Sequence, residues 1–366
     1  MVTIAYRRLA IAVLLVLGCI QAASAETWKF LVYGDSRAHK GAGVNTAILD
    51  ELAAATVAEK PAFVIFTGDL VGTGGPAVFA TWKECMQPVY DAGIGVCPVM
   101  GNHDAPGLDD FKSMFITPLA SHPFPGCEDL VLDSTASDGR SYAFRYRDAL
   151  FLALDNYSDG NKRFHAVNQT FVDARLADRD ADATPLLFAV AHEPAFRAGG
   201  DAGLEQKPAE RDRFWQGLED AGCRAYLCGH MHLYADARIA RADDPSRGIH
   251  QVIVGTAGAP LYSLNYWDDT GSWTVADLAH DTEHYGYVRV VVDDEAQTVA
   301  QTWVQRTAAN VFEDVPAGVL PYVDPPRRLS WFTIAVVAVV LITLVIDVPV
   351  FLWIYRRRKR RRSDPA

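Results

Sequence analysis

The chain has 366 residues, of which half are hydrophobic and 22% are charged, so it can bury a sizeable core and is not a disordered protein. Its six cysteines are too few for a disulfide scaffold. Residues 26–326 carry 23 basic and 43 acidic side chains, a net charge of −20 within an overall −11, which argues against nucleic-acid binding through phosphate contacts.

The first 25 residues have the pattern of a secretory signal peptide. Arg7 and Arg8 form a basic start, residues 9–17 form an apolar run, and residues 23–25 are a small-residue cleavage pattern. The apolar run is too short to span a membrane comfortably, so we predict cleavage after residue 25. Lipidation of Cys19 is the alternative, because the residues before it loosely resemble a lipoprotein signal.

Apolar runs typical of strands alternate with helix-like segments from residue 26 to about 307. The predicted strands are Trp28–Tyr33, Phe63–Thr67, Val96–Met100, Ala149–Leu154, Leu186–Ala191, Ala225–Leu227, Gln251–Val254 and Tyr287–Val292. The predicted helices are Val44–Glu59, Ala77–Tyr90, Gln169–Ala181 and Ala209–Ala221. This alternation favours one α/β domain. The last strands have no helix between them, so part of the sheet structure is expected to be antiparallel.

The C-terminal end predicts a membrane anchor. After an aperiodic stalk at 308–329, residues 330–355 are almost continuously apolar and, at about 1.5 Å per residue, can cross a hydrocarbon core of about 30 Å. Asp347 interrupts this run near one end, where we interpret it as an interfacial carboxylate; contact with a charged partner helix is the alternative. The basic tail at 356–366 predicts that this end is cytoplasmic. We therefore expect a single-pass protein of the cytoplasmic membrane whose body is extracytoplasmic, or periplasmic in a bacterium.

Five cysteines remain after the predicted cleavage. They are Cys85, Cys97, Cys127, Cys223 and Cys228. The expected compartment permits disulfides, and Cys85–Cys97 and Cys223–Cys228 are candidate pairs, although spacing alone leaves the pairing open.

Five of the predicted strands end in short clusters of Asp, Asn and His. The clusters are GDSR at 34–37, GDLV at 68–71, GNHD at 101–104, AHEP at 191–194 and GHMH at 229–232. Any one of them has an ordinary structural explanation, such as a turn carboxylate or a core histidine. Ligands of α/β sheets gather beyond the carboxyl ends of strands, and these side chains suit Zn, Mn or Fe. The set predicts a shared metal site.

These clusters, in this order, resemble the five blocks of the calcineurin-like metallophosphoesterases, in particular the purple-acid-phosphatase-like branch. The resemblance covers about residues 28–292. It implies an α/β fold of two mixed β-sheets packed as a sandwich and flanked by helices. It also implies a centre of two divalent or trivalent metal ions, Fe, Mn or Zn, that activates water for attack on phosphorus.

Carried over position by position, the resemblance implies a role for each cluster. The implied metal ligands are Asp35 and His232 for the first ion, Asp69 as the bridge, and Asn102, His192 and His230 for the second ion. His103 would lie beside the scissile phosphate as a charge stabiliser or general acid.

Two positions depart from the family pattern. Arg37 stands where the family commonly has a ligand histidine, and its guanidinium cannot bind a metal but can hold phosphate oxygens bidentately. We therefore predict that Arg37 is a catalytic residue and that the first metal site is weakened, completed by water, or completed by His39. Gly72 stands where the purple enzymes have tyrosine, so we expect no purple charge-transfer band unless Tyr33 replaces it.

The sequence thus predicts a metal-dependent hydrolase of phosphoesters, with phosphomonoesters or nucleotides as the favoured substrates. A phosphodiesterase with the same centre is one alternative. A catalytically silent ectodomain that binds a metal or a partner is another, and the presence of His103 together with the second-site ligands argues against it.

Overall fold

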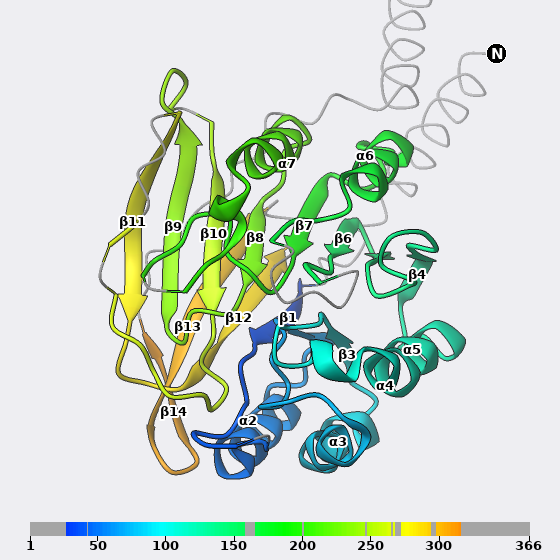
Figure 1. The fold of residues 1–366 in the computed structure, drawn as a ribbon, viewed down its shortest axis with the longest axis vertical. Coiled ribbons are helices and arrows are strands. Elements are labelled where there is room, and N and C mark those ends of the chain that lie inside the picture. The colour runs from blue at the N-terminus through cyan, green and yellow to red at the C-terminus, as the bar shows by residue number, and fades with distance from the viewer. Residues whose placement is uncertain are drawn as a thin grey trace, which may run out of the picture. The chain divides into compact units, whose positions relative to one another are not determined.

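The computed structural model describes residues 27–315, except 42, 158–164, 200, 246, 265, 268–271 and 294–297 (Figure 1). The predicted signal peptide (1–25), transmembrane helix (330–355) and basic tail (356–366) lie outside the described residues. Within the described part of the chain, no helix combines the length and the apolar character needed to cross a membrane.

One of the two sheets has six strands in the order β14-β13-β12-β1-β2-β3. Its strands are β1 (Thr27–Tyr33), β2 (Phe63–Phe66), β3 (Gly95–Pro98), β12 (Gly286–Asp293), β13 (Thr298–Ala308) and β14 (Val311–Val315). The first three are parallel because helices α2 (Thr46–Glu59) and α3 (Pro76–Asp91) return the chain between them. The last three are added in antiparallel order, so the sheet is mixed.

The other sheet has eight strands in the order β11-β9-β10-β8-β7-β6-β5-β4. Its strands are β4 (Cys127–Leu132), β5 (Tyr142–Tyr146), β6 (Ala149–Ala153), β7 (Leu186–Val190), β8 (Ala225–Cys228), β9 (Tyr234–Arg241), β10 (Ile249–Val254) and β11 (Trp273–Asp281). Strands β6, β7, β8 and β10 are parallel and the outer pairs are antiparallel. This sheet is mixed as well.

Aromatic side chains hold the two sheets together. The ring of Phe30 on β1 stacks on Phe63 in its own sheet, with 5.3 Å between centroids. The same ring meets Phe151 and Phe188 of the other sheet edge-on, at 5.3 and 5.4 Å. All four rings are buried. Such pairs stabilise by about 0.5–1.5 kcal/mol each beyond the burial of their area, so this layer fixes how the sheets face each other.

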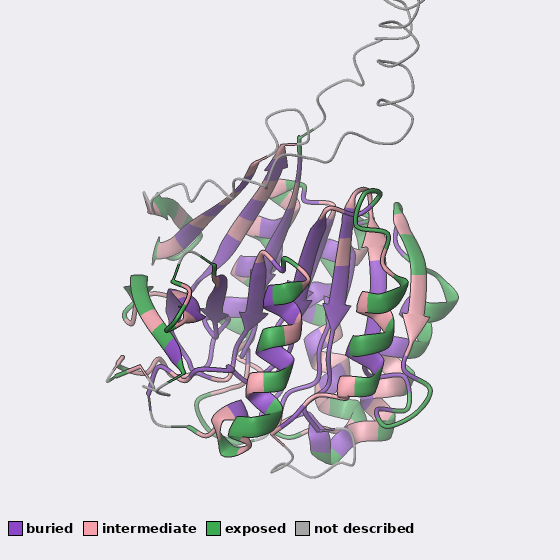
Figure 2. Ribbon diagram, turned by 90° about the horizontal axis from the view of Figure 1, so that it is seen from above, coloured by how far each residue is buried: buried purple, intermediate pink, exposed green. Residues whose placement is uncertain are grey.

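Helices cover the outer faces of both sheets. Figure 1 shows α6 (Gln169–Asp178) and α7 (Pro208–Asp220) over the eight-stranded sheet. Helix α7 buries Phe214, Trp215 and Leu218 against it, at the spacing of one helical face. Figure 2 shows the strands mostly buried and the helices buried along one side only. The predicted sandwich of two mixed sheets flanked by helices is therefore confirmed.

Short helical segments complete the chain between the main elements. They are η1 (Ala105–Gly107), α4 (Leu108–Phe111), η2 (Lys112–Ile116) and α5 (Thr117–Ser121) between β3 and β4, and η3 (Leu204–Gln206) before α7.

Two expectations from the sequence need correction. The β13–β14 hairpin carries the six-stranded sheet to Val315, past residue 307, so the start of the predicted stalk belongs to the fold. The five cysteines of the described chain are free thiols, so the candidate pairs Cys85–Cys97 and Cys223–Cys228 are not formed.

Candidate metal centre

All six predicted metal ligands follow the carboxyl ends of parallel strands. Asp35, Asp69 and Asn102 come after β1, β2 and β3 of one sheet, and His192 comes after β7 of the other. His230 and His232 follow β8, which is the neighbour of β7. Because parallel strands end at the same edge, the two sheets together bring these side chains to one place, as expected for ligands of an α/β sheet.

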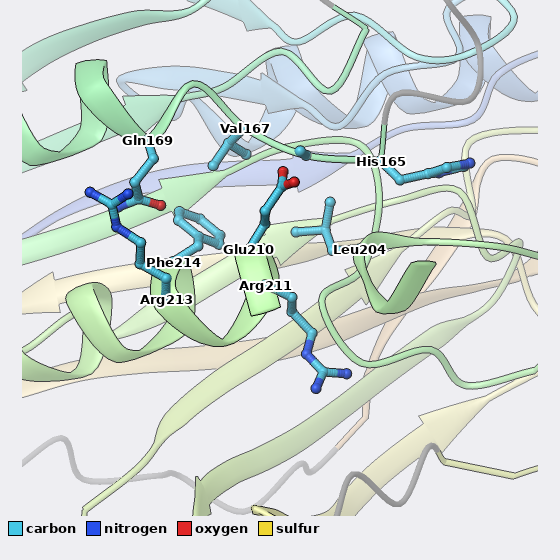
Figure 3. Close-up of a pocket in the computed structure, with 9 residues that line it drawn as sticks. His165, Val167, Gln169, Leu204, Glu210, Arg211, Arg213 and Phe214 are labelled. Atoms are coloured by element: carbon cyan, nitrogen blue, oxygen red, sulfur yellow. The ribbon is translucent and has the colours of Figure 1, made fainter. Parts of the chain in front are cut away.

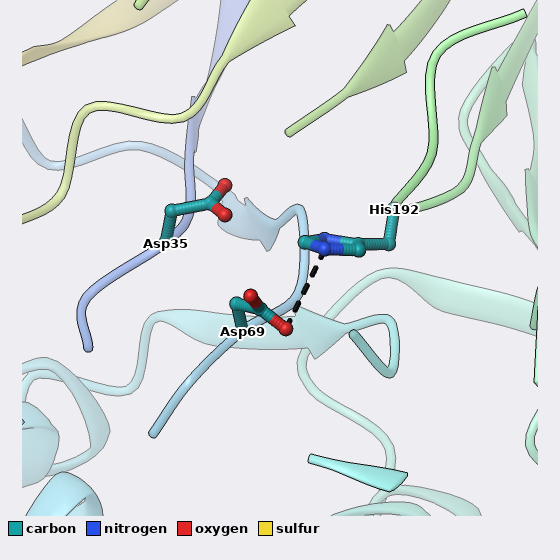
Figure 4. Close-up of side chains that lie close together, drawn as sticks. All are labelled: Asp35, Asp69 and His192. Atoms are coloured by element: carbon teal, nitrogen blue, oxygen red, sulfur yellow. Dashed lines mark ion pairs between the residues drawn. The ribbon is translucent and has the colours of Figure 1, made fainter. Parts of the chain in front are cut away.

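Three of these residues form the centre of the cluster. One ligand atom each of Asp35, Asp69 and His192 lies within 4.8 Å of the other two, and all three residues are buried. Figure 4 shows their side chains directed into a common space, with His192 Nε2 3.4 Å from Asp69 Oδ1. Carboxylate and imidazole at this spacing are a donor set that suits a transition metal.

The remaining three predicted ligands adjoin this centre. Asn102 Oδ1 lies 3.1 Å and His230 Nδ1 lies 3.2 Å from His192 Nε2. His232 Nε2 lies 3.5 Å from Asp35 Oδ1. The structure therefore brings together every residue that the sequence predicts as a metal ligand.

Backbone carbonyls fix the orientation of all three histidines. His192 Nδ1 donates to the carbonyl oxygen of Thr67 at 2.7 Å, and His232 Nδ1 donates to that of Pro260 at 2.9 Å. His230 Nε2 donates to the carbonyl oxygen of Ala202 at 2.8 Å. Each ring is thereby left with a lone-pair nitrogen that faces the cluster, which is the arrangement of metal-bound histidines.

Two of those lone pairs face each other, which tests the fit of a metal. With Nδ1 of His192 and Nε2 of His230 donating to carbonyls, the nitrogens that remain face each other 3.2 Å apart. Burial and the neighbouring His192 lower the pKa of His230; burial would also lower the pKa of His192, but nearby Asp69 and Asp35 raise it. A cation must lie between two facing lone pairs, either a proton on His192 or a metal ion in its place, so the residues fit a bound metal ion.

The electrostatics of the carboxylates agree with this arrangement. Burial would raise the pKa of Asp35, but nearby His192, His232 and His230 hold it below its ordinary value. Asp35 is therefore a carboxylate, the form that binds a metal.

The strand ends reach the site through strained backbone. Asp35, Asp69 and His230 have φ angles of 62°, 51° and 70°, in the left-handed region that costs non-glycine residues of order 1–3 kcal/mol each. Two glycines allow the close approach: a Cβ at Gly101 would lie 2.1 Å from Asp69 Oδ1, and one at Gly229 would lie 2.2 Å from Asp35 Oδ2. Strain gathered at one place is typical of a functional site.

The cluster opens into a polar cavity of about 500 Å³. The residues that line it are Arg37, Asp69, Asn102, His103, His165, Glu193, Asp201, Ala202, Gln206, His230, His232 and Tyr262. His103 is fixed at its base, since its backbone N–H donates to Asp69 Oδ1 at 2.8 Å and its Nδ1 donates to the Gly72 carbonyl at 2.7 Å. Its Nε2, 3.9 Å from Asp69 Oδ2, is left for a substrate.

Arg37 lines the same cavity, as the sequence predicts. Its guanidinium hydrogen-bonds to the hydroxyl of Tyr262, which also bonds Asp201, while burial and Asp201 raise the pKa of Tyr262 to about 12. The Nε of Arg37 is buried and has no hydrogen-bond partner within the described chain. A guanidinium group in the wall of this cavity can hold an oxyanion.

The two alternatives raised for the departures are not supported. His39 is exposed and is not among the described residues that line the cavity, so it does not replace the missing histidine ligand. The hydroxyl of Tyr33 bonds Thr56 and Met86 on the helices α2 and α3, and burial raises its pKa. Tyr33 therefore faces away from the centre and does not replace the tyrosine missing at Gly72.

Several residues of the site were not predicted. Asp104 accepts hydrogen bonds from the backbone N–H groups of Gly101, Leu70 and Val71, which fixes the loops that carry Asp69 and Asn102. Burial and the nearby Asp69 raise the pKa of Asp104 to about 8. Its position as the last residue of the GNHD cluster could have identified Asp104 from the sequence. Of the other lining residues, His165, Asp201 and Tyr262 come from loops without a motif, and Gln206 is the last residue of the short helix η3.

The fold and the site first define a class: a two-sheet α/β protein with candidate metal ligands grouped at the carboxyl ends of its strands. Residues 13–234 match the family model described as calcineurin-like phosphoesterase, and the chain belongs to this family. The suspected relationship to calcineurin-like metallophosphoesterases is confirmed.

Comparison with individual proteins gives more distant similarities. A probable cyclic nucleotide phosphodiesterase of Rhodococcus erythropolis is 27% identical over 186 residues, which are 50% of this chain and 54% of that protein. The chain thus matches about half the length of this curated relative.

Two solved structures share the fold. One is purple acid phosphatase PPD1 from yellow lupin (Lupinus luteus) seeds, with a TM-score of 0.58 and 15% identity over 80% of this chain and 53% of that one. The other is GAP50, described as the anchor in the inner membrane complex of Plasmodium, with a TM-score of 0.52 and 15% identity over 82% and 90% of the two chains.

Proposed function

We propose that this phosphoesterase is a metal-dependent hydrolase of phosphomonoesters, including nucleotides, that acts outside the cytoplasmic membrane. The observation that carries the proposal is the set of three carbonyl-oriented histidines whose free nitrogens meet two buried carboxylates beside His103. Phosphodiesters are the second candidate substrates, favoured by the similarity to a probable cyclic nucleotide phosphodiesterase. The extracytoplasmic location is supported by the signal-like start and the apolar segment at 330–355.

The residues that would hold two metal ions divide as the family pattern implies. Asp35 and His232 would hold the first ion, Asn102, His192 and His230 the second, and Asp69 both. Bound there, Fe, Mn or Zn would lower the pKa of water to make an attacking hydroxide and would offset the charge of the phosphoryl oxygens.

The other side chains act on the substrate directly. Arg37 lines the cavity, where its guanidinium can bind a phosphoryl oxygen. His103 is oriented by the Gly72 carbonyl so that its Nε2 can donate a proton to the departing alkoxide. In-line attack of hydroxide on phosphorus would form a new P–O bond while the bond to the ester oxygen breaks, and the alkoxide would leave as the alcohol with the proton from His103.

The test uses chelated protein reloaded with Mn, Zn or Fe and assayed on nitrophenyl phosphate and bis-nitrophenyl phosphate. We expect activity to return with metal, to be abolished by Asp69→Asn, and to fall about 100- to 10,000-fold in His103→Asn with metal content unchanged. His39→Asn, at an exposed position outside the cavity, is the matched control and should behave as wild type. Full metal occupancy without turnover of either ester would instead indicate a silent binding domain.

The location needs a separate test in intact cells. A protease added outside the cytoplasmic membrane should digest the body and leave the tail at 356–366 protected. Protection of the body would overturn the proposed location while leaving the catalytic proposal intact.

A further inference from the structure

His165 is a wall residue of the metal-site cavity that the mechanism above does not use. It lies between β6 and α6, and its Nδ1 is 3.0 Å from both carboxylate oxygens of Glu193. Its φ is 50°, a left-handed conformation that costs a non-glycine residue and persists only where the surroundings impose it. The surrounding structure therefore holds this imidazole in place at some cost in folding stability.

Glu193 is built to orient that ring. Its side chain is 1% exposed and also accepts a hydrogen bond from the hydroxyl of Tyr157 at 2.6 Å. Its backbone is fixed as well, because Tyr226 donates to its carbonyl oxygen and Asn156 accepts from its N–H. A buried carboxylate accepts hydrogen bonds, so Nδ1 of His165 carries a proton, and Nε2 is the nitrogen left over.

This pair is separate from the metal ligands. Among the described residues, neither His165 nor Glu193 hydrogen-bonds to any of the six candidate ligands, whereas His103 is held directly against Asp69. Both members of the pair nevertheless line the cavity. His165 thus lines the cavity without being part of the ligand cluster, so it can contact a part of the substrate other than the phosphoryl group.

His165 also borders a second, smaller cavity, which is not the substrate site. That cavity, between the loop at 165–167 and helix α7, holds only about 60 Å³, room for about two water molecules. Figure 3 shows the His165 ring extending away from Glu210 and Arg213, which line that cavity. The ring therefore belongs to the metal-site cavity.

We propose that His165, oriented by Glu193, binds a hydroxyl group of the leaving alcohol, so that the preferred substrates are phosphate esters of polyhydroxy alcohols such as sugars, nucleosides or glycerol. A neutral ring accepts from a hydroxyl through Nε2, and a charged ring donates to it, so a hydroxyl suits both states. The cavity lining agrees, since Asp201 and Gln206 are polar and Ala202 is the one aliphatic residue among those described. This inference rests on the proposed hydrolase function.

The decisive variant is His165→Asn. Asparagine tolerates a positive φ, and its amide can replace Nδ1 as the donor to Glu193 while Nε2 is lost. We expect the KM for glycerol 1-phosphate to rise about tenfold, the loss from one hydrogen bond, with the KM for nitrophenyl phosphate and the competitive Ki of inorganic phosphate unchanged. His165→Gln, whose amide reaches the place of Nε2, should restore part of the loss, and His39→Asn should change nothing.

Two kinetic results would overturn the inference. Equal changes for glycerol phosphate, nitrophenyl phosphate and inorganic phosphate would show a structural role, and no change for any of them would show that His165 does not bind the alcohol.

Calorimetry on the metal-loaded protein separates this inference from the proposed function. If wild type binds glycerol 1-phosphate more tightly than inorganic phosphate but hydrolyses no ester, the hydrolase proposal fails. In that case a selective loss of this preference in His165→Asn still supports the hydroxyl site. Wild type that binds neither compound contradicts both.

Discussion

At the scale of single residues, Arg37 distinguishes this centre from the family pattern. The proposed first metal position would have Asp35, His232 and the shared Asp69 as ligands, and Arg37 stands where the family pattern has a further imidazole. A fixed positive charge here would disfavour a metal ion while favouring a phosphate. We therefore expect this site to bind its first metal ion less tightly, and an anion more tightly, than a site with histidine at position 37.

The variant Arg37→His tests this exchange. It removes the charge and adds a ligand, so we expect more tightly bound metal per chain after gel filtration and a KM for nitrophenyl phosphate raised about tenfold by loss of the oxyanion contact. Metal analysis and steady-state kinetics measure the two effects. Arg37→Gln, which removes the charge without adding an imidazole, should raise KM and bind less metal than Arg37→His; equal metal content in the two variants would refute the ligand argument.

The residues that could be predicted from the sequence are those within the strand-end clusters. Asp69, Asn102 and His192 follow strands directly, so a short motif and the geometry of a parallel sheet were enough to place them. Tyr262 and His165 could not be predicted, because they reach the cavity from loops with no regular geometry. Which loops fold over an edge depends on tertiary packing that no local pattern records.

At the scale of elements, the strand-to-loop junctions decide whether the ligands converge. Gly101 lies where the loop after β3 passes Asp69, and a side chain there would meet the carboxylate 2.1 Å away. The two loops must therefore touch through backbone atoms.

We expect Gly101→Ala to lower the midpoint of thermal unfolding and to abolish tight metal binding, because Asp69 has to move. Gly217→Ala, inside helix α7 with its nearest neighbour atom 3.9 Å away, is the matched control. That change should stabilise the fold by about 0.5–1 kcal/mol through helix propensity. Calorimetry and metal analysis of both variants measure these effects. A Gly101→Ala protein with normal metal content would show that metal binding does not require this close contact between Gly101 and Asp69.

Helix α2 contacts the β13–β14 hairpin through the carboxylate of Glu51. Arg306 donates to both oxygens of Glu51, at 2.7 and 3.0 Å, and the backbone N–H of Asn310 donates at 2.6 Å. The hydrogen bond from Arg306 lowers the pKa of Glu51 below its ordinary value.

The stability that this contact provides should depend on pH in a defined direction. Since the folded pKa is depressed, the stabilisation is present above the ordinary value of about 4.3 and is lost as pH falls through the lower folded value. We expect Glu51→Gln to have a lower free energy of unfolding in urea than wild type at pH 7, and this difference to become smaller below pH 4. A difference that is constant or that grows in acid would contradict a stabilising role for the Glu51 carboxylate.

The predicted elements were those with a strong local signal. The strands β2, β3, β7 and β8 are completely buried, so each reads as a short apolar run. The strand β11 was missed because most of its residues are at least partly exposed, and β14 was missed for the same reason. Edge strands such as β4 and β14 owe their form to pairing with a neighbour rather than to their own composition.

At the scale of the whole molecule, metal binding should determine stability. Asp35 and Asp69 are buried close together, and a cation that binds the folded chain alone stabilises it by about 2.7 kcal/mol at a concentration 100 times its Kd. We expect Mn or Zn to raise the midpoint of thermal unfolding in proportion to the logarithm of metal concentration. Asp69→Asn should remove most of this dependence, and a midpoint that ignores metal in wild type would contradict the assigned centre.

The candidate ligands come from both sheets and from distant parts of the chain, with Asp35 near one end of the domain and His232 almost two hundred residues later. A fragment that stops after β3 would carry the first three acidic and amide groups and none of the imidazoles. Uptake of metal during refolding should therefore occur after each of the two sheets has formed. The bound metal would then stabilise the association of the two sheets. A metal-sensitive dye would measure the rate of this final step, the uptake of metal during refolding.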